Sequence, residues 1–340
     1  MHRFLAILWF ALLAAPACAG TIDFTVRADP ACGGRNLLDT LPPAELARIE
    51  ALASAGPYPE GNRWTAEKPG SRITVVGTLH LTDPRMAAPA GRLKAEIAAA
   101  DTVYVEATDA EAKAMKAAVS HDPGLLFVTE GPTLPERLSE ADWQEVKRLA
   151  GEHGIPGFMA AKMRPWYLMM VLGLPACALK DAARGGRTGL DGLVMDAADE
   201  AGVTILPLEP WDTALKVLGG MAPDDQLDMV RLSAAMARDS EDILATLQAA
   251  YFAERHRLLW EWSRAVAAER MTDPAAATEG FAVLDHALVG QRNRAWLDIL
   301  VPAASGKRLV VAVGAAHLGG EDGLLAGLER AGYRLTRQTF

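Results

Sequence analysis

Cysteine is scarce in this 340-residue chain, and long apolar segments are scarcer still. Only three cysteines occur and none belongs to a C-x-x-C pair, so a zinc site built from thiolates is not expected. Beyond the N-terminal residues, the most apolar window is 168–179, which is too short to span a bilayer and is interrupted by Gly173 and Pro175. We therefore expect no membrane span.

Positive charge is in deficit. Acidic side chains outnumber Lys and Arg by 43 to 34, and the formal net charge is −9. A surface with this balance repels phosphate backbones, so nucleic-acid binding is not expected. Half of the residues are nonetheless apolar, and a chain of this length can bury a full core.

The motifs of several common enzyme classes are also absent. The chain contains no H-E-x-x-H, no G-x-S-x-G and no P-loop, and no Ser or Cys has an identifiable base partner. The glycine pairs 185–186 and 319–320 lack any phosphate-binding pattern. A hydrolase built on this chain would need another kind of site.

The N-terminus has the pattern of a secretory signal peptide. Residues 1–3 are short and basic, residues 4–15 are apolar, and the small residues 17–19 fit a cleavage site. We expect a signal peptide over 1–19 and one domain over 20–340, exported to a periplasm or secreted. A lipid anchor at Cys18 is the alternative, although Ala15 stands where a lipobox prefers Leu.

Two cysteines remain after such cleavage, Cys32 and Cys177. In an oxidising compartment an isolated pair favours a disulfide, which would join the N-terminal extension to the middle of the chain. Two unpaired thiols are the alternative.

Several β-branched runs predict strands, at 73–76, 102–105, 203–208 and 309–313. An amphipathic helix over 87–99 separates the first two, so we expect these two strands to be parallel and adjacent. The pattern is that of an α/β (α+β) protein.

The rest of the chain is mostly helical in pattern. Helical insertions are expected at approximately 110–200 and 211–300, with one long helix over 243–267 among them. Residues 60–70 are expected to be a polar loop, and 333–336 a final strand.

The candidate chemistry lies where these strands end. Two strands run into the same G-x-x-H motif, once from Gly77 to His80 and once from Gly314 to His317, and a third ends at Glu106. Carboxyl ends of strands are where ligands collect in α/β folds. Two imidazoles and a carboxylate are suitable ligands for a borderline cation such as Zn, Mn, Co or Fe. Loop histidines with ordinary hydrogen bonds are the alternative reading.

Other candidate residues carry weaker signals. Glu209 ends the strand 203–208 and is a second strand-end carboxylate. His256 and His286 lie within helical patterns, where a structural role is the expectation. The Met and aromatic side chains of 166–170 are expected to pack in a core rather than line a ligand pocket.

An ordered set of segments resembles the TraB/GumN family. The matching segments are VVGTLH (75–80), TVYVEAT (102–108), RPW (164–166), GLDGLVMDAADEAGVTILPLE (189–209), LVGQRNRAWLDIL (288–300) and VAVGAAHLGGEDGLLAGLERAGYRL (311–335). The similarity extends from about Cys32 to the C-terminus and is to the GumN-like branch, whose members are usually exported. This family is related to the Tiki metalloproteases and to the erythromycin-esterase (EreA) and ChaN-like proteins.

The resemblance implies a mixed β-sheet flanked by helices, with a large helical insertion. It also implies Mn- or Co-dependent proteolysis at His80, Glu106 and His317, and it matches the family's Arg-Asn pair to Arg292 and Asn293. Arg292 could bind a substrate carboxylate or stabilise an oxyanion; a buried ion pair is the alternative. The residues expected around the ligands are Asn293, Gly77, Gly314 and Glu209.

The leading hypothesis is therefore an exported metal-dependent hydrolase, a metalloprotease acting on a peptide or small-molecule substrate. A divalent ion (Mn, Co or Zn) would activate water, and Glu106 would be a ligand or a general base. The alternatives are a non-catalytic envelope protein that binds haem, a metal or a small ligand, and a scaffold whose site has decayed. The sequence indicates no oligomeric state.

Overall fold

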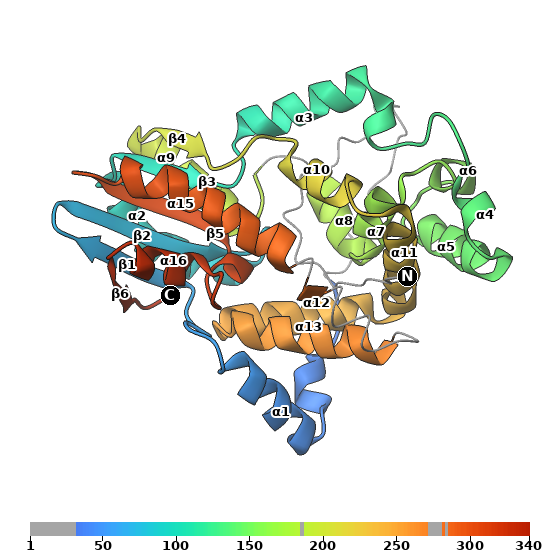
Figure 1. Cartoon of the computed structure of the whole chain (residues 1–340), viewed down its shortest axis with the longest axis horizontal. Coiled ribbons are helices and arrows are strands. Elements are labelled where there is room, and N and C mark those ends of the chain that lie inside the picture. The colour runs from blue at the N-terminus through green and yellow to red at the C-terminus, as the bar shows by residue number, and fades with distance from the viewer. Residues whose placement is uncertain (1–31, 184–186, 271–280, 283–284) are drawn as a thin grey trace.

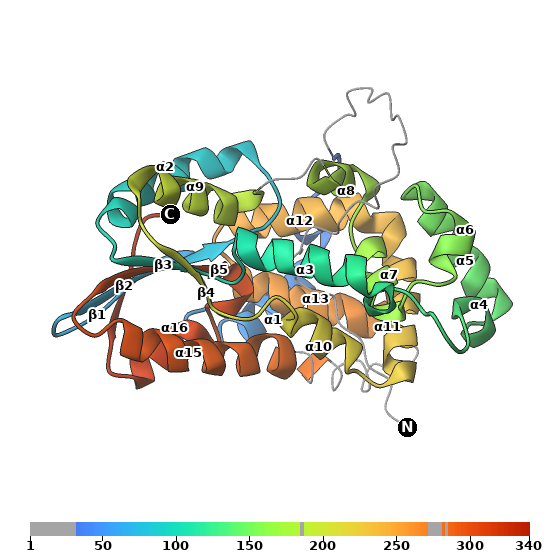
Figure 2. The same cartoon turned by 90° about the horizontal axis from the view of Figure 1, so that it is seen from above.

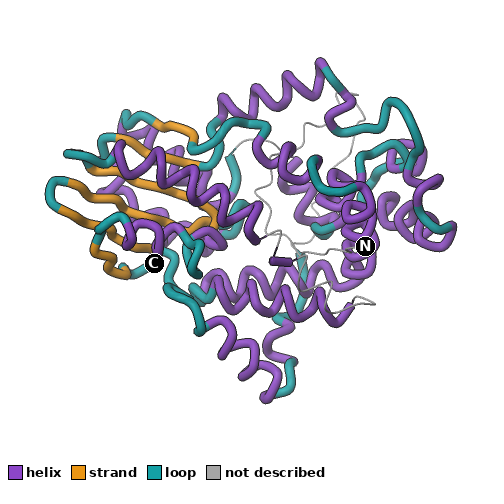
Figure 3. Tube along the Cα trace, viewed as in Figure 1, coloured by secondary structure: helices purple, strands orange, loops and turns teal. Residues whose placement is uncertain are grey.

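Figure 1 shows the computed structural model, which describes residues 32–183, 187–270, 281–282 and 285–340. A mixed β-sheet with its covering helices forms one side of the molecule, and a set of helices forms the other (Figures 1 and 3). The predicted signal peptide and Cys18 lie outside the described residues. Within the described ranges, no helix has the length and apolar character needed to cross a membrane.

The sheet has six strands in the order β4-β3-β5-β2-β1-β6. The strands are β1 Arg63–Lys68, β2 Ser71–Thr78, β3 Thr102–Val105, β4 Ile205–Pro207, β5 Arg308–Gly314 and β6 Arg334–Arg337. Strands β2, β3, β4 and β5 are parallel, whereas β1 is antiparallel to both of its neighbours. The expected mixed sheet is thus confirmed. Its central strands β2 and β5 are buried along most of their length because helices cover both faces.

The prediction that β2 and β3 are adjacent was wrong. Strand β5 lies between them, with Val311 opposite Val75 on one side and Tyr104 on the other. The crossover helix that joins β2 to β3 spans the width of one additional strand, which the chain supplies more than 200 residues later. Local pattern fixes the direction of such a crossover but not its span.

Two local predictions also needed correction. Residues 60–70 contain strand β1, whose partly buried residues pair with β2 through a tight turn at Gly70 (φ +72°). The helix expected over 243–267 is two helices, α12 Ser240–Phe252 and α13 His256–Arg270. Glu254, with φ +59°, breaks the helix between them, and its carboxylate accepts a hydrogen bond from the backbone of Asn62.

Helices cover both faces of the sheet (Figure 2). One face packs against α2 Ala87–Ala98 and α9 Gly189–Ala201, and the other against α15 Gln291–Ala303 and α16 Leu324–Arg330. The first apolar layer joins Val105 of β3 to Leu93 and Leu190, and the second joins Val75 to Trp296. Both layers extend to the edge where the parallel strands end.

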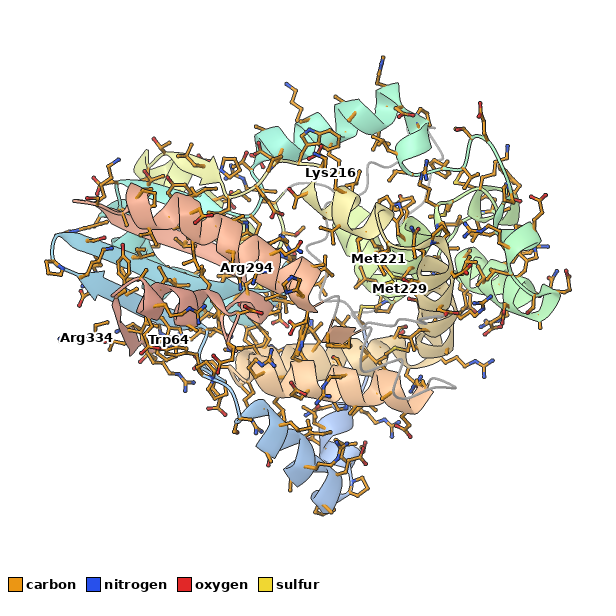
Figure 4. The ribbon with its side chains drawn as sticks, viewed as in Figure 1. Trp64, Lys216, Met221, Met229, Arg294 and Arg334 are labelled. Atoms are coloured by element: carbon orange, nitrogen blue, oxygen red, sulfur yellow. A yellow bond between two sulfur atoms is a disulfide. The ribbon has the colours of Figure 1, made fainter. Side chains whose placement is uncertain are left out.

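The other helices lie beside the sheet, and most of them contribute side chains to a second core. They are α3 Asp109–His121, α4 Leu134–Arg137, α5 Glu140–Glu152, α6 Gly157–Ala160, α7 Pro165–Leu172, α8 Ala176–Ala183, α10 Thr213–Gly219 and α11 Pro223–Met236, with α12 and α13. Trp166 and Met169 are buried in this core, which confirms the prediction for the Met-aromatic segment. Met229, labelled in Figure 4, belongs to the same core. Helix α1 Pro43–Ala53 packs separately against α13 through Ile49 and Trp262.

The predicted disulfide between Cys32 and Cys177 is present, with the two Cα atoms 5.5 Å apart. It closes a loop of 145 residues and joins the first described residue to α8. Cross-linking of residues so far apart in sequence restricts the unfolded chain strongly.

Replacing both Cys32 and Cys177 by Ser is expected to lower the free energy of unfolding by at most about 5 kcal/mol, the chain entropy of a loop of this length. Urea unfolding of the wild-type and double-variant proteins measures this difference. In thiol titration of the denatured wild-type protein, Cys32 and Cys177 should not react; two reactive thiols at these positions would contradict the pairing.

His256, at the start of α13, is a buried histidine that is not among the predicted metal ligands. Its side chain has 1% exposure, and Nε2 lies 3.0 Å from the carbonyl oxygen of Tyr58. Its Nδ1 has no hydrogen-bond partner among the described residues. Burial lowers the pKa of His256 to about 4, so the ring is neutral in the folded protein at neutral pH.

Acid should destabilise the protein through this residue. The unfolded chain takes up the proton near pH 6.5 and the folded chain only near pH 4, so stability is lost as the pH falls between these values. His256→Gln keeps a donor for Tyr58 but removes the titration. The loss of unfolding free energy between pH 7 and pH 4 should be smaller in this variant by about 3 kcal/mol. Equal losses in both proteins would contradict the assignment, and the exposed His121→Gln is the control.

Candidate active site

The candidate site lies at the edge where three parallel strands end. Glu106 follows β3, His80 follows β2 and His317 follows β5, and because β5 is the middle strand all three side chains reach the same place. A Cβ atom added to Gly314 would lie 3.3 Å from Oε1 of Glu106, 3.7 Å from Cδ2 of His317 and 3.8 Å from Nε2 of His80. The three residues predicted as ligands therefore surround one point.

Gly77 is required for close approach rather than for an unusual backbone angle. A Cβ atom at Gly77 would lie 2.6 Å from Cδ1 of Leu318 and 3.1 Å from Ala315. Its absence lets the 3₁₀ turn Ala315–His317 lie directly against the end of β2. The first G-x-x-H motif thus makes room for the second.

His80 has a partner that the sequence did not reveal. Oδ2 of Asp191, in the first turn of α9, lies 2.7 Å from Nδ1 of His80, and Oδ1 of Asp191 accepts a 2.6 Å hydrogen bond from the hydroxyl of Thr78. Gly189 (φ +65°) brings the start of α9 against the backbone of Leu79 and His80, where no side chain would fit. Burial by itself would lower the pKa of His80, but the Asp191 carboxylate outweighs it and raises the pKa to about 9.

His317 has a neutral partner instead. Nδ1 of His317 lies 2.8 Å from Oδ1 of Asn293, and the Asn293 amide donates to the carbonyl oxygens of His317 and Asp322. An amide oxygen only accepts, so Nδ1 carries the proton and Nε2 presents a lone pair. Burial, with Arg292 nearby, lowers the pKa of His317 to about 3, and the ring is neutral.

Arg292 lies between the carboxylates and His317. Its Nε and Nη2 donate to Glu209 at 2.8 and 2.7 Å, and Nη2 also donates to Glu106 at 2.6 Å. Nη1 lies 3.2 Å from both the Leu288 carbonyl oxygen and Nε2 of His317. All five N–H groups of the guanidinium are engaged within the protein, which is the arrangement of the buried ion pair and leaves none directed at a substrate.

The two carboxylates respond differently to burial. Burial would raise the pKa of Glu106, but Arg292, the two histidines and the backbone N–H of Gly314, 2.6 Å from Oε1, lower it to about 2. For Glu209 burial outweighs the hydrogen bonds from Arg292, and its pKa is raised. Glu106 is therefore a permanent anion at this edge.

Neighbouring residues on α15 have separate partners. Arg294, labelled in Figure 4, forms a 3.1 Å ion pair with Asp322 and is half exposed. Trp296 donates to Glu209 at 3.2 Å and its ring lies 4.4 Å from that of His317. One helix thus supplies a buried arginine, an amide and an aromatic ring to the site.

The donors fit a borderline divalent ion by their chemistry. Both imidazoles have Nδ1 fixed by an acceptor, as metal-binding histidines do, and Gly314 leaves space between Glu106 and the two rings. The side chains are nevertheless spaced as a hydrogen-bonded cluster. In the described part of the chain, no three His, Cys, Asp or Glu side chains are arranged so that they could hold one ion as they stand. Arg292 supplies the positive charge in this arrangement.

Comparison with known proteins finds one family whose model covers most of this chain. The model of the TraB/PrgY/gumN family matches residues 62–337, a range that contains every residue of the site. Two curated relatives, both named "Uncharacterized protein YbaP", come from Escherichia coli (strain K12) and Shigella flexneri. Each is 26% identical over 285 residues, which cover 82% of this chain and 97% of the relative.

Gly314→Ala should remove ion binding while leaving the stability of the fold nearly unchanged. Gly314 has φ −50° and ψ 137°, which any residue adopts, so the free energy of unfolding should change by less than about 1 kcal/mol. The added methyl group would occupy the space between Glu106 and the two rings, and affinity for Mn²⁺ measured by calorimetry should be lost. Gly91→Ala is the control, because no atom of the described residues lies within 4 Å of its added Cβ. Wild-type Mn²⁺ affinity in Gly314→Ala would contradict this placement.

Proposed function

This chain belongs to the TraB/PrgY/gumN family, and we propose that it is an exported metal-dependent hydrolase that cleaves peptides. The observation that supports the proposal is the convergence of His80, Glu106 and His317 around Gly314 at the carboxyl edge of the sheet. Two imidazoles and one carboxylate are a common protein ligand set in hydrolytic metal sites, which keep a further position open for water or substrate.

The residues divide into ligands and supports. Nε2 of each histidine and a carboxylate oxygen of Glu106 would hold the ion, while Asp191 and Asn293 fix the orientation of the two rings. A bound Mn, Co or Zn ion would supply Lewis acidity that activates water for hydrolysis. Glu106 and His317 are buried, whereas the His80 side chain is partly exposed.

Glu106 is better suited to hold the ion than to act as the general base. A general base works best when its pKa lies near the working pH, whereas Arg292 and the two histidines lower the pKa of Glu106 to about 2. A permanent anion is the form that a cation requires. Between the two roles expected for Glu106, the electrostatics favour the ligand.

An exported location is part of the proposal. The Cys32–Cys177 disulfide supports it, because such bonds persist in oxidising compartments and are rare in the cytosol. The sequence pattern of residues 1–19 points in the same direction.

The proposal is tested on protein purified without chelator. Metal analysis should find a bound divalent ion in the wild type, and digestion of a peptide library should show cleavage. His80→Ala and His317→Ala should lose the ion and reduce cleavage to background, because each removes one imidazole donor. His121→Ala, at the exposed end of α3, is the matched control and should change neither.

Unchanged cleavage in both histidine variants, together with no retained metal in the wild type, would exclude this function. A visible absorption titration with haem should be run beside the digest. A strong haem band without any cleavage would support the binding-protein alternative instead.

A further inference from the structure

We propose that Arg292 is the resident cation of this site and determines which divalent ions the site accepts. The inference rests on the proposed function, since it concerns the same donors. It assigns to Arg292 a role other than contact with substrate: the guanidinium competes with the metal ion for Glu106 and His317, and only ions that gain imidazole nitrogens can displace it.

The geometry supports competition because Arg292 and the ion need the same atoms. Nη2 of Arg292 is 2.6 Å from Glu106 and Nη1 is 3.2 Å from Nε2 of His317. The lone pair of Nε2 is available there because Nδ1 of His317 faces an amide oxygen. One edge of the guanidinium therefore binds two of the three proposed metal ligands, Glu106 and His317.

The other edge of the guanidinium is held independently of those donors. Nε and Nη2 of Arg292 bind both oxygens of Glu209 at 2.8 and 2.7 Å in a bidentate pair. Glu209 follows β4, the strand at the sheet edge beyond β3, and is not among the proposed ligands. When Arg292 is released from Glu106 and His317, the guanidinium stays paired with Glu209. Its buried positive charge therefore keeps a partner.

The competition has a consequence for selectivity. Glu106 and Glu209 bind the same Nη2 atom, and without Arg292 two neighbouring carboxylates would offer an oxygen site suited to Mg²⁺ or Ca²⁺. With Arg292 present, an ion that prefers oxygen gains only Glu106. Mn, Co and Zn also gain Nε2 of His317 and, once the His80 ring has released its proton to solvent, Nε2 of His80, which offsets the displacement of the arginine.

Calorimetric titration with Mn²⁺ and with Mg²⁺, and thermal melts in each salt, test the proposal on the full mature chain. Arg292→Met removes the charge and keeps much of the volume, and Arg294→Met is the control on the same helix because it removes only the half-exposed pair with Asp322. In Arg292→Met the ratio of the Mg²⁺ to the Mn²⁺ dissociation constant should fall by about tenfold or more. Its melting temperature should rise on addition of Mg²⁺, while the wild type and Arg294→Met should not respond.

The dissociation-constant ratio decides the outcome. A ratio unchanged from the wild type, with no melting response to Mg²⁺, would overturn the proposal and show that Arg292 is only a structural ion pair. If Arg292→Met does not fold by circular dichroism, Arg292→Lys is judged by the same ratio, because one ammonium cannot reproduce the fork that spans Glu106 and Glu209.

The same titrations separate this inference from the proposed function. Mn²⁺ binding by the wild type with an unchanged ratio in the variant would leave the metal site intact and remove the role of Arg292. Mn²⁺ binding by Arg292→Met but not by the wild type would support Arg292 as the occupant while excluding a metal enzyme in the native chain. Absence of binding in both proteins would overturn both.

Discussion

The buried guanidinium of Arg292 is the interaction on which the site depends. It joins α15 to the ends of β3 and β4 through Glu106 and Glu209, and to the turn after β5 through His317. Burying three charged groups is costly unless each is fully paired, and here all five N–H groups have acceptors. The cluster therefore behaves as a unit, in which loss of one member leaves another charge uncompensated. A divalent ion at the same place would have to preserve that balance.

Sheet order determines how the site is assembled. Because β5 is inserted between β2 and β3, Gly314 lies opposite Thr78, and the backbone N–H of Gly314 can reach Glu106. If β2 and β3 were adjacent, as their short crossover suggested, His317 would arrive from outside the pair instead of from its centre. The close packing of Gly77 against Ala315 depends on the same order. The long-range pairing of β5 is thus a structural requirement of the chemistry.

The sequence was sufficient for the features that short segments encode. The strand ends, the two G-x-x-H motifs and Glu106 could be recognised locally, and Cys32 and Cys177 were the two cysteines left for a disulfide. The pairing of Asp191 with His80 could not be predicted, because it joins residues 111 positions apart through the packing of α9 on the sheet. Strand β1 was missed because its alternation is weak and its turn residues resemble a loop. Glu209 was noted as a strand-end carboxylate, but its bidentate pairing with Arg292 is a tertiary contact.

The two G-x-x-H motifs give histidines of different character. His80 faces the carboxylate of Asp191, which favours the charged ring, whereas burial and the nearby guanidinium of Arg292 favour the neutral ring of His317. Equivalent motifs on neighbouring strands therefore do not produce equivalent donors, because partners from α9 and α15 decide the electronic state of each ring. An ion bound between them would be coordinated by two different imidazoles. Nδ1 of one ring faces the Asp191 carboxylate, and Nδ1 of the other faces the neutral Asn293 amide. Helices that cover opposite faces of the sheet thus adjust a site that the strands only position.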